Sequence, residues 1–319
     1  MLQTEVLIVG GGPAGSACAW YLRRHHIDCL VLDREPFPRV KLCAGWIPPQ
    51  VLHDLEIRPE EYPHSLTSFA AFRIAIRGIG FSLPTRQYAI RRVEFDHWLL
   101  QRSGVPVATH HVRTIERRNG AYVVDGEFSG VYLIGAGGTH CPVYRTFFRD
   151  VHPRARDTLI ITQEEEFPYA VVDPHCYLWF MENQLPGYSW YVPKVGGYVN
   201  VGVGGMAETL TAHGDTIQRH WDVLVAKLEH RGLVREHPFA PKGHSYYLRQ
   251  HSGAVRVDNA FIVGDAAGLA TRDMGEGIGP AIKSGLLAAE AIVHGTDYSV
   301  DNIRQLSLVP RWLFKMFSR

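Results

Sequence analysis

The sequence has 319 residues, of which 46% are hydrophobic and 20% are charged. This composition is typical of a soluble globular protein and excludes a disordered, collagen-like or coiled-coil chain. Lys and Arg number 33 and Asp and Glu number 32, so the formal net charge is +1. Because a balanced charge without a basic run provides no field to hold a polyanion, we expect no nucleic-acid partner.

Cysteine and histidine usage gives no sign of a metal site or a disulfide framework. The five cysteines are odd in number and irregularly spaced, without a C-x-x-C pair, and the 17 histidines are scattered. We therefore expect no bound metal. The N-terminus enters a strand-like run without a signal-peptide pattern, and no stretch of about 18 apolar residues occurs. These features predict a cytoplasmic protein that does not span a membrane.

The first 33 residues are predicted to form a βαβ unit. Residues 5–9 are an apolar, β-branched run, residues 13–25 have a helical pattern, and residues 29–32 form a second apolar strand that ends at Asp33. A βαβ unit places its two strands side by side and parallel.

Later segments divide into two kinds of strand. Residues 131–134 and 260–263 are apolar throughout, as expected of strands that are covered on both faces of a parallel sheet. Residues 69–83 and 177–203 instead alternate and are rich in aromatic and β-branched residues, which favours antiparallel strands of a second lobe. A helical pattern follows Gly275 and continues to His294.

Residues 10–15 read G-G-G-P-A-G and fit the G-x-G-x-x-G pattern. The pattern follows a predicted strand and opens a helix at Pro13 and Ala14. Gly10 permits the tight turn, Gly12 lets a pyrophosphate approach the backbone, and Gly15 lets helix and strand pack closely. The carboxylate of Asp33, at the end of the next strand, can accept hydrogen bonds from ribose hydroxyls. This context predicts a dinucleotide site.

A second glycine-rich region favours FAD over NAD as the dinucleotide. Gly264 and Asp265 follow an apolar strand, and residues 275–280 read G-E-G-I-G-P at the start of the last predicted helix. In FAD enzymes with this arrangement the aspartate binds the ribitol chain and the helix start meets the pyrimidine edge of the flavin. A helix N-terminus stabilises the negative charge that reduced flavin carries there.

Three further segments resemble one enzyme family. Residues 38–45 (PRVKLCAG) are similar to a PxxKxCGG loop, residues 92–96 (RVEFD) to an RxxFD segment, and residues 188–194 (YSWYVPK) to a YxWxFPK motif, with Val192 in place of Phe. With the glycine motifs, they resemble the geranylgeranyl reductases among the FAD-dependent oxidoreductases of the p-hydroxybenzoate hydroxylase fold. The chain departs from the family after the middle strand, where residues 136–138 read A-G-G instead of A-D-G.

The resemblance implies an α/β fold in which an antiparallel-sheet substrate domain is inserted into a Rossmann-type FAD-binding domain. The FAD-binding domain is expected to be discontinuous, with residues 1–61, 85–156 and 251–319, and the substrate domain to contain residues 62–84 and 157–250. The resemblance and the glycine motifs together assign a cofactor-binding set: Gly10, Gly12, Pro13, Ala14, Gly15, Asp33, Arg34, Lys41, Cys43, Ala44, Gly45, Arg92, Gly137, Gly264, Asp265, Gly275, Gly277, Ile278 and Gly279.

Cys43 is the candidate catalytic residue, because the resemblance places its loop beside the isoalloxazine. A thiol there can donate a proton or tune the flavin. The alternative is a small apolar side chain packed under the loop. Cys141, which follows the A-G-G turn, is a weaker candidate, whereas Cys18 and Cys29 are expected in the core.

Tyr188 and Trp190 are the candidate substrate-binding residues. At i and i+2 on a predicted strand they face the same side, where they can form the wall of a substrate tunnel. The alternative is that they are one face of an ordinary sheet core. Residues 308–317 are apolar with interspersed cations and fit either a segment that docks on a membrane surface to collect a lipid substrate or a terminal segment packed on the protein.

The leading functional hypothesis is an FAD-dependent reductase of prenyl C=C bonds on a hydrophobic isoprenoid lipid or alcohol. We expect its electron donor to be NAD(P)H or ferredoxin. A second hypothesis is a flavin-dependent monooxygenase or halogenase of an aromatic substrate, because residues 188–193 are loosely similar to a halogenase WxWxIP segment. A third is a non-catalytic flavoprotein that binds a lipid or senses redox state. Fold alone does not choose among them.

Overall fold

The structure is a computed structural model, and it describes residues 1–64, 66–250 and 253–308. The chain forms two compact units. Unit 1 contains residues 1–39, residues 93–154 and the described residues from Tyr247 onward, and unit 2 contains residues 40–92 and 155–246. Residues 40–61 and 85–92, which the sequence analysis assigns to the FAD-binding domain, therefore cluster with unit 2. The functional domain boundaries stay a prediction.

Unit 1 is built on the parallel sheet that the apolar runs predict. Strand β1 (Leu2–Val9) pairs in parallel with β2 (Cys29–Asp33) on one side and with β9 (Phe128–Gly135) on the other. Strands β16 (Ala260–Ile262) and β6 (Val107–Thr109) extend the parallel arrangement. The order across the sheet is β15 (Arg256–Val257), β16 (Ala260–Ile262), β9 (Phe128–Gly135), β1 (Leu2–Val9), β2 (Cys29–Asp33) and β6 (Val107–Thr109). The expected Rossmann-type topology is confirmed.

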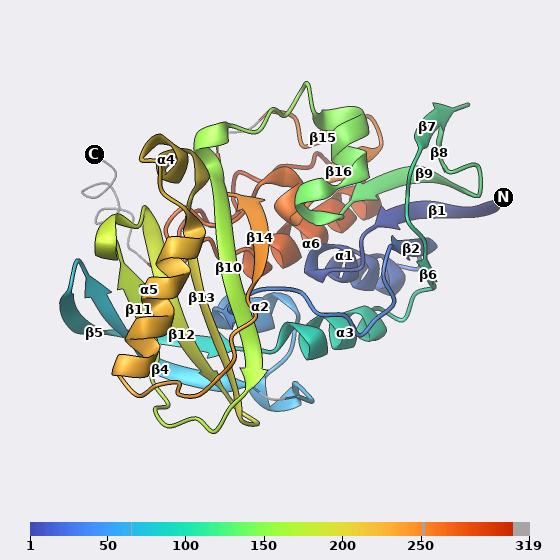
Figure 1. The fold of residues 1–319 in the computed structure, drawn as a ribbon. Coiled ribbons are helices and arrows are strands. Elements are labelled where there is room, and N and C mark those ends of the chain that lie inside the picture. Colours follow the sequence, from blue (N-terminus) through green and yellow to red (C-terminus); the bar gives the residue numbers. More distant parts are fainter. Residues whose placement is uncertain (65, 251–252, 309–319) are drawn as a thin grey trace. The chain divides into compact units, whose positions relative to one another are not determined.

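Helices α1 (Pro13–Arg24) and α6 (Ile278–His294) pack against each other in unit 1 (Figure 1). Their backbones approach so closely that a Cβ added at Gly285 would stand 2.1 Å from the Ala14 oxygen. Beyond these elements, β7 (Ile115–Arg118) and β8 (Ala121–Val124) form an antiparallel extension on β9 that the sequence analysis does not predict.

Unit 2 contains the second sheet. Its strand order is β14 (Lys242–Tyr247), β10 (Leu159–Pro168), β13 (Tyr198–Met206), β12 (Gly187–Lys194), β11 (Cys176–Phe180), β4 (Thr67–Ile76), β5 (Ile79–Ala89) and β3 (Trp46–Ile47). Most neighbours are antiparallel as expected, but β4 and β11 are parallel. They come from different stretches of the chain, so a long crossover rather than a hairpin joins them.

Helix α5 (Ile217–His230) covers one face of the unit 2 sheet (Figure 1). It begins with a cap in which the Thr216 hydroxyl accepts a hydrogen bond from the Arg219 N–H, and it packs Trp221, Leu224 and Leu228 onto that face. That face contains buried valines of β13 and the rings of Trp179 and Tyr191. The shorter helices of this unit are α2 (Pro49–Asp54) and α4 (Ala207–Ala212), and α3 (Arg92–Ser103) starts at its border.

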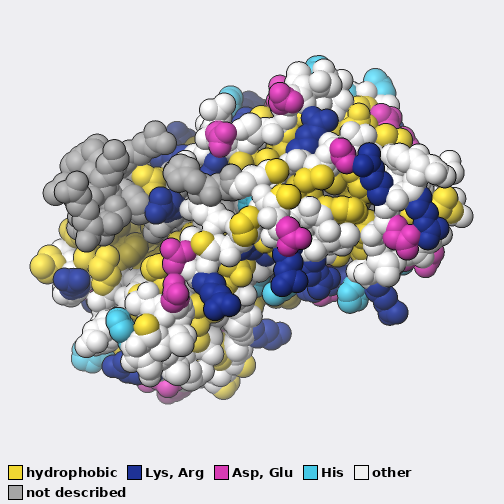
Figure 2. Space-filling model, turned by 90° about the horizontal axis from the view of Figure 1, so that it is seen from above, with side chains coloured by type: hydrophobic (Ala, Val, Ile, Leu, Met, Phe, Trp, Pro, Cys, Tyr) yellow, Lys and Arg dark blue, Asp and Glu magenta, His cyan; other side chains and the backbone are white. Residues whose placement is uncertain are grey.

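Surface features are consistent with the balanced composition. On the face shown in Figure 2, side chains of both charge signs are intermingled with hydrophobic ones. Among the helices that the structure describes, none combines the length and apolarity needed to cross a bilayer. The segment 308–317, for which the sequence suggests membrane docking or packing, lies outside the described residues from residue 309 onward.

Candidate functional site

The fold itself requires Gly10, in the turn between β1 and α1, and Gly15, in the first turn of α1, but it does not require Gly12. A Cβ at Gly10, whose φ is +113°, would stand 2.3 Å from the Ala136 oxygen, and a Cβ at Gly15 would stand 1.9 Å from the Gly10 oxygen. A Cβ at Gly12 would meet only a guanidinium nitrogen of Arg39, at 3.7 Å. The space beside Gly12 is therefore open, as a pyrophosphate that approaches the backbone requires.

The start of α1 suits an anion. Gly12 is the N-cap residue and brings no capping side chain, and Pro13 occupies the first helical position. The positive end of the helix dipole and the first-turn N–H groups are thus directed to the space beside Gly12. The Arg39 guanidinium adds a positive charge on the same side, although the sequence analysis does not single this residue out.

Asp33 lies buried at the end of β2, next to the glycine turn. Its Oδ2 accepts a hydrogen bond from the Gly11 N–H at 2.7 Å, and its Oδ1 accepts one from the Glu35 N–H at 3.1 Å. Each carboxylate oxygen keeps a second lone pair, so both can still accept from ribose hydroxyls. Arg34, also predicted to contact the cofactor, is exposed and pairs with Glu35.

Unit 1 brings the other predicted cofactor segments to this turn. The turn at residues 136–137 lies against Gly10, where an added Cβ would stand 2.3 Å from the Ala136 oxygen and 2.8 Å from the Gly137 nitrogen. A Cβ at Gly264 would stand 3.3 Å from the Ala14 Cβ, and one at Gly277 would stand 3.2 Å from Asp265 Oδ1. The three glycine segments are therefore neighbours in space, which is the arrangement that one dinucleotide needs.

Arg154 holds two of these segments together, and no motif in the sequence marks it. Its guanidinium donates to the Thr139 oxygen at 2.6 Å and to the Ala266 oxygen at 2.8 Å, and it lies over the Tyr144 ring at 3.6 Å. It thereby links the turn after β9 to the turn that contains Asp265.

The start of α6 has an acceptor of its own. Glu276 Oε1 accepts a hydrogen bond from the Gly279 N–H at 2.6 Å. Burial raises the pKa of Glu276 to about 7, against hydrogen bonds from the N–H groups of Gly279 and Ile278 that lower it. These two N–H groups are therefore engaged within the chain, and the roles of Ile278, Gly279 and Gly275 toward a flavin stay predictions.

The Cys43 loop belongs to unit 2. Gly45 lies so close to the backbone of Ile90 that an added Cβ would stand 2.2 Å from the Ile90 oxygen. In the same loop, Lys41 Nζ lies 2.5 Å from His244 Nε2. The half-buried Cys43 accepts a hydrogen bond at its Sγ from the Gly45 N–H at 3.3 Å. The neighbouring Ala44 is buried.

The surroundings of Cys43 favour the protonated thiol. Burial raises the pKa of Cys43, Arg92 and Lys194 lower it, and Glu164 raises it. A thiol that keeps its proton at neutral pH suits a proton donor better than a nucleophile. The other cysteines, Cys18, Cys29, Cys141 and Cys176, are free and buried.

The structure joins the Cys43 loop to the predicted substrate residues. Asn200 Nδ2 donates to the Cys43 backbone oxygen at 3.3 Å, and Asn200 Oδ1 accepts from Trp190 Nε1 at 2.7 Å. Tyr188 lies beside Trp190, with ring centroids 5.6 Å apart, and Trp46 lies 6.2 Å from Trp190. Trp46 was missed because a single tryptophan three residues after Cys43 has no periodic pattern.

The aromatic residues of this region do not form one cluster. Phe180 lies against Tyr188, at 4.9 Å between centroids, on the face that contains Trp190. Tyr177, Trp179 and Tyr191 point to the opposite face, under α5. The strand alternation thus separates a core-forming aromatic group from the group near Cys43.

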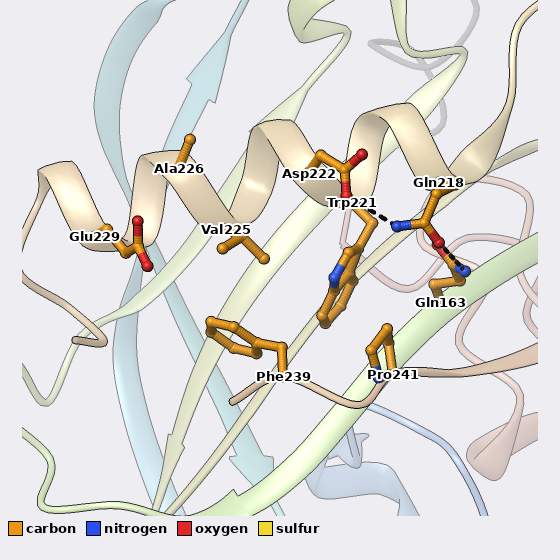
Figure 3. A pocket seen from close by; sticks show the side chains of 9 residues that line it. All are labelled: Gln163, Gln218, Trp221, Asp222, Val225, Ala226, Glu229, Phe239 and Pro241. Carbon is orange, nitrogen blue, oxygen red and sulfur yellow. Dashed lines mark hydrogen bonds between the residues drawn. The ribbon is translucent and has the colours of Figure 1, made fainter. Parts of the chain in front are cut away.

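A hollow of about 560 Å³ lies on the α5 side of unit 2 (Figure 3). Trp221 on α5, Gln163 on β10 and the segment that contains Phe239 and Pro241 line it. None of the predicted site residues is among its lining residues, so it does not coincide with the predicted site. Across the described part of the chain, no group of three or more His, Cys, Asp or Glu side chains is placed to hold a metal ion.

Comparison with known proteins agrees with the fold and the cofactor. A family model described as an NAD(P)-binding Rossmann-like domain matches residues 8–55. A menaquinone reductase of Mycolicibacterium smegmatis is 30% identical, over 93% of this chain and 78% of the relative. A geranylgeranyl diphosphate reductase of Rhodobacter capsulatus is 29% identical, over 91% of this chain and 75% of the relative.

Solved structures show the same fold. A geranylgeranyl bacteriochlorophyll reductase-like protein from Thermoplasma acidophilum has a TM-score of 0.79 at 22% identity, over 94% of this chain and 81% of that one. A flavin-dependent brominase has a TM-score of 0.74 at 19% identity, over 93% of this chain and 81% of that one. At these identities the likeness concerns the fold alone.

Fold, glycine turns and relatives together define an FAD-dependent oxidoreductase. Within that class, the sequence identity over nearly the whole chain places it in the geranylgeranyl reductase family.

Gly12→Val is expected to fold but to lose FAD. The backbone at Gly12 has φ −72° and ψ −174°, which valine adopts readily, and the space beside it is open in the folded chain. A valine side chain would occupy the space that the pyrophosphate needs. Flavin absorbance per chain after gel filtration measures the loss, and thermal melting verifies the fold. Gly15→Val, by contrast, should not fold. A folded Gly12→Val variant with full FAD content would contradict the site.

Proposed function

We propose that this reductase adds hydrogen to prenyl C=C bonds of a hydrophobic isoprenoid lipid or alcohol. The named relatives act on such compounds, among them a digeranylgeranylglycerophospholipid reductase of Methanopyrus kandleri, 26% identical over 93% of this chain. The observation that carries the proposal is the connection, through Asn200, between the Cys43 loop and the aromatic face of Tyr188 and Trp190. It combines a proton-bearing group with an apolar surface in one place.

Reduction of an isolated double bond needs a hydride at one carbon and a proton at the other. FAD that has first been reduced by the electron donor would supply the hydride, and would be left oxidised. We propose that the Cys43 thiol supplies the proton: its S–H bond breaks, the electron pair stays on sulfur and the proton forms the new C–H bond. Tyr188 and Trp190 hold the prenyl chain and exclude water, since positioning and an apolar surface lower the barrier of such a step.

The remaining assignments of the sequence analysis are part of the proposal. We assign FAD binding to the glycine turns, Asp33 and Asp265 and, as the resemblance implies, to Lys41, Gly45 and Arg92. The electron donor is NAD(P)H or ferredoxin. Contact with a membrane surface, where a lipid substrate is held, is proposed for the segment 308–317.

An anaerobic assay tests the proposed reaction. Purified protein with reduced FAD is mixed with polyprenyl lipids and alcohols, and the products are analysed by mass spectrometry. We expect a mass gain of two hydrogens per reduced bond, together with oxidation of the flavin. Flavin oxidation that instead requires oxygen or halide, with no gain of hydrogen by any prenyl compound, would point to the monooxygenase or halogenase hypothesis.

Cys43→Ser is expected to slow the oxidation of reduced flavin by the prenyl substrate. A hydroxyl is a weaker acid than a thiol, and loss of a general acid lowers the rate of the chemical step by about 10²-fold or more. FAD content should stay near that of the wild type. Stopped-flow absorbance measures the step. A wild-type rate in a folded, FAD-loaded variant would show that Cys43 only packs under the loop.

Trp190→Phe distinguishes a substrate wall from a sheet core. Trp190 is 5% exposed, and the substitution removes its hydrogen bond to Asn200. If the indole positions the prenyl chain, turnover should fall and the distribution of reduced bonds should change, since small misplacements are costly in rate. Trp179→Phe, on the opposite face of the adjacent strand, is the matched control: it should lower the melting temperature and leave the distribution unchanged. The same behaviour from Trp190→Phe would assign Trp190 to the core.

A further inference from the structure

Glu164 is a buried carboxyl group that the proposed mechanism does not use. It lies on β10, with the residue only 3% exposed, and its Oε2 has no hydrogen-bond partner among the described residues. A buried carboxyl oxygen without a partner costs folding free energy, so its presence calls for an explanation.

The strand register brings Glu164 to the face that contains Trp190. Glu164 pairs with Gly202 on β13, and Gly202 pairs with Trp190 on β12. A Cβ at Gly202 would stand 2.2 Å from Trp190 Cζ2 and 2.7 Å from the Glu164 Cβ. Because Gly202 has no side chain, the indole lies across β13 next to Glu164.

Asn200 connects Glu164 to Cys43. Its side chain hydrogen bonds to Glu164, accepts from Trp190 Nε1 and donates to the Cys43 backbone oxygen. Glu164 is also among the charges that act on the Cys43 thiol. The carboxyl, the indole and the thiol loop therefore meet at one amide side chain.

The charged groups around Glu164 come from several elements. Burial raises its pKa to about 7, against Lys194 on β12, Lys41 in the Cys43 loop, the Asn200 hydrogen bond and Arg92 at the start of α3, which all lower it. Two of these cations have further partners: Lys194 Nζ lies 2.5 Å from Glu166 Oε2, and Lys41 contacts the ring of His244 on β14. Glu164 thus changes charge near neutral pH.

We propose that Glu164 is a positioning residue that acts through Cys43 and sets the pH range in which the thiol keeps its proton. Arg92 and Lys194 favour the thiolate, whereas the Glu164 carboxylate favours the thiol. As the pH rises, Glu164 becomes charged and opposes the loss of the Cys43 proton. The consequence for catalysis rests on the proposed role of Cys43 as proton donor, but the electrostatic link does not.

Alkylation of Cys43 in the FAD-bound protein tests this link. Iodoacetamide reacts with the thiolate, and mass spectrometry of the Cys43 peptide separates it from the four buried cysteines. Glu164→Gln removes the charge that favours the thiol, so labelling should become several-fold faster at slightly alkaline pH and its midpoint should shift to lower pH. Glu165→Gln is the matched control, since Glu165 faces the other side of β10 and bonds to His237 and the Ala240 N–H.

A folded Glu164→Gln protein with the wild-type labelling midpoint would overturn the proposal. If Glu164→Gln does not fold, the pH dependence of Cys43 labelling in the wild-type protein tests the proposal instead. In the range around pH 7 where Glu164 ionises, the labelling rate should rise less steeply with pH than it does for a thiol that ionises alone, and an unbroken rise of about tenfold per pH unit through this range would overturn the proposal.

The activity profile separates this inference from the proposed function. The alkaline limit of prenyl reduction should shift to lower pH in Glu164→Gln and stay unchanged in Glu165→Gln. If no prenyl compound is reduced while the labelling midpoint still shifts, the proposed function fails and the link between Glu164 and Cys43 stands.

Discussion

Close approach of backbones at glycine is the constraint on which unit 1 depends. A side chain at Gly10, Gly15 or Gly285 would collide with a backbone oxygen, and these three contacts set the distances between the β1–α1 turn, the turn after β9 and helix α6. Because they fix the backbone, the space beside Gly12 and the carboxylates of Asp33 and Asp265 are held by the fold. The geometry of the predicted nucleotide site is thus a consequence of packing that the chain needs in order to fold.

In unit 2, a polar side chain fixes the position of the Cys43 loop on the sheet. Asn200 uses its oxygen for Trp190 and its nitrogen for the Cys43 loop, so a buried amide joins a strand of the sheet to an irregular segment. Buried polar groups of this kind are stable only when each is satisfied. Next to Asn200, Glu164 Oε2 has no hydrogen-bond partner among the described residues, and a buried polar atom of this kind calls for an explanation.

The sequence predicted those features that local pattern determines. The apolar runs at 5–9, 131–134 and 260–263 are parallel neighbours, and the turns that the glycine patterns mark lie next to one another in space. It did not predict that β4 and β11 pair in parallel, because pairing between distant stretches leaves no local pattern. Arg154 and Glu164 were missed for a related reason: an isolated charged residue reveals its role only through partners that the fold brings to it.

The fold alone does not determine which reaction this protein catalyses. A brominase shares the fold over most of this chain, so the nucleotide turns and the two sheets cannot by themselves select reduction over halogenation. The proposed reduction is assigned to the face of unit 2 opposite α5, where the register places Tyr188, Trp190 and Glu164 together and Asn200 attaches the Cys43 loop. Strand alternation decides this directly, because a shift of one residue would turn Trp190 toward α5 and Tyr191 toward Cys43. If reduction takes place at this face, as we propose, it depends on the register of β12 as well as on the architecture that this chain shares with other flavoproteins.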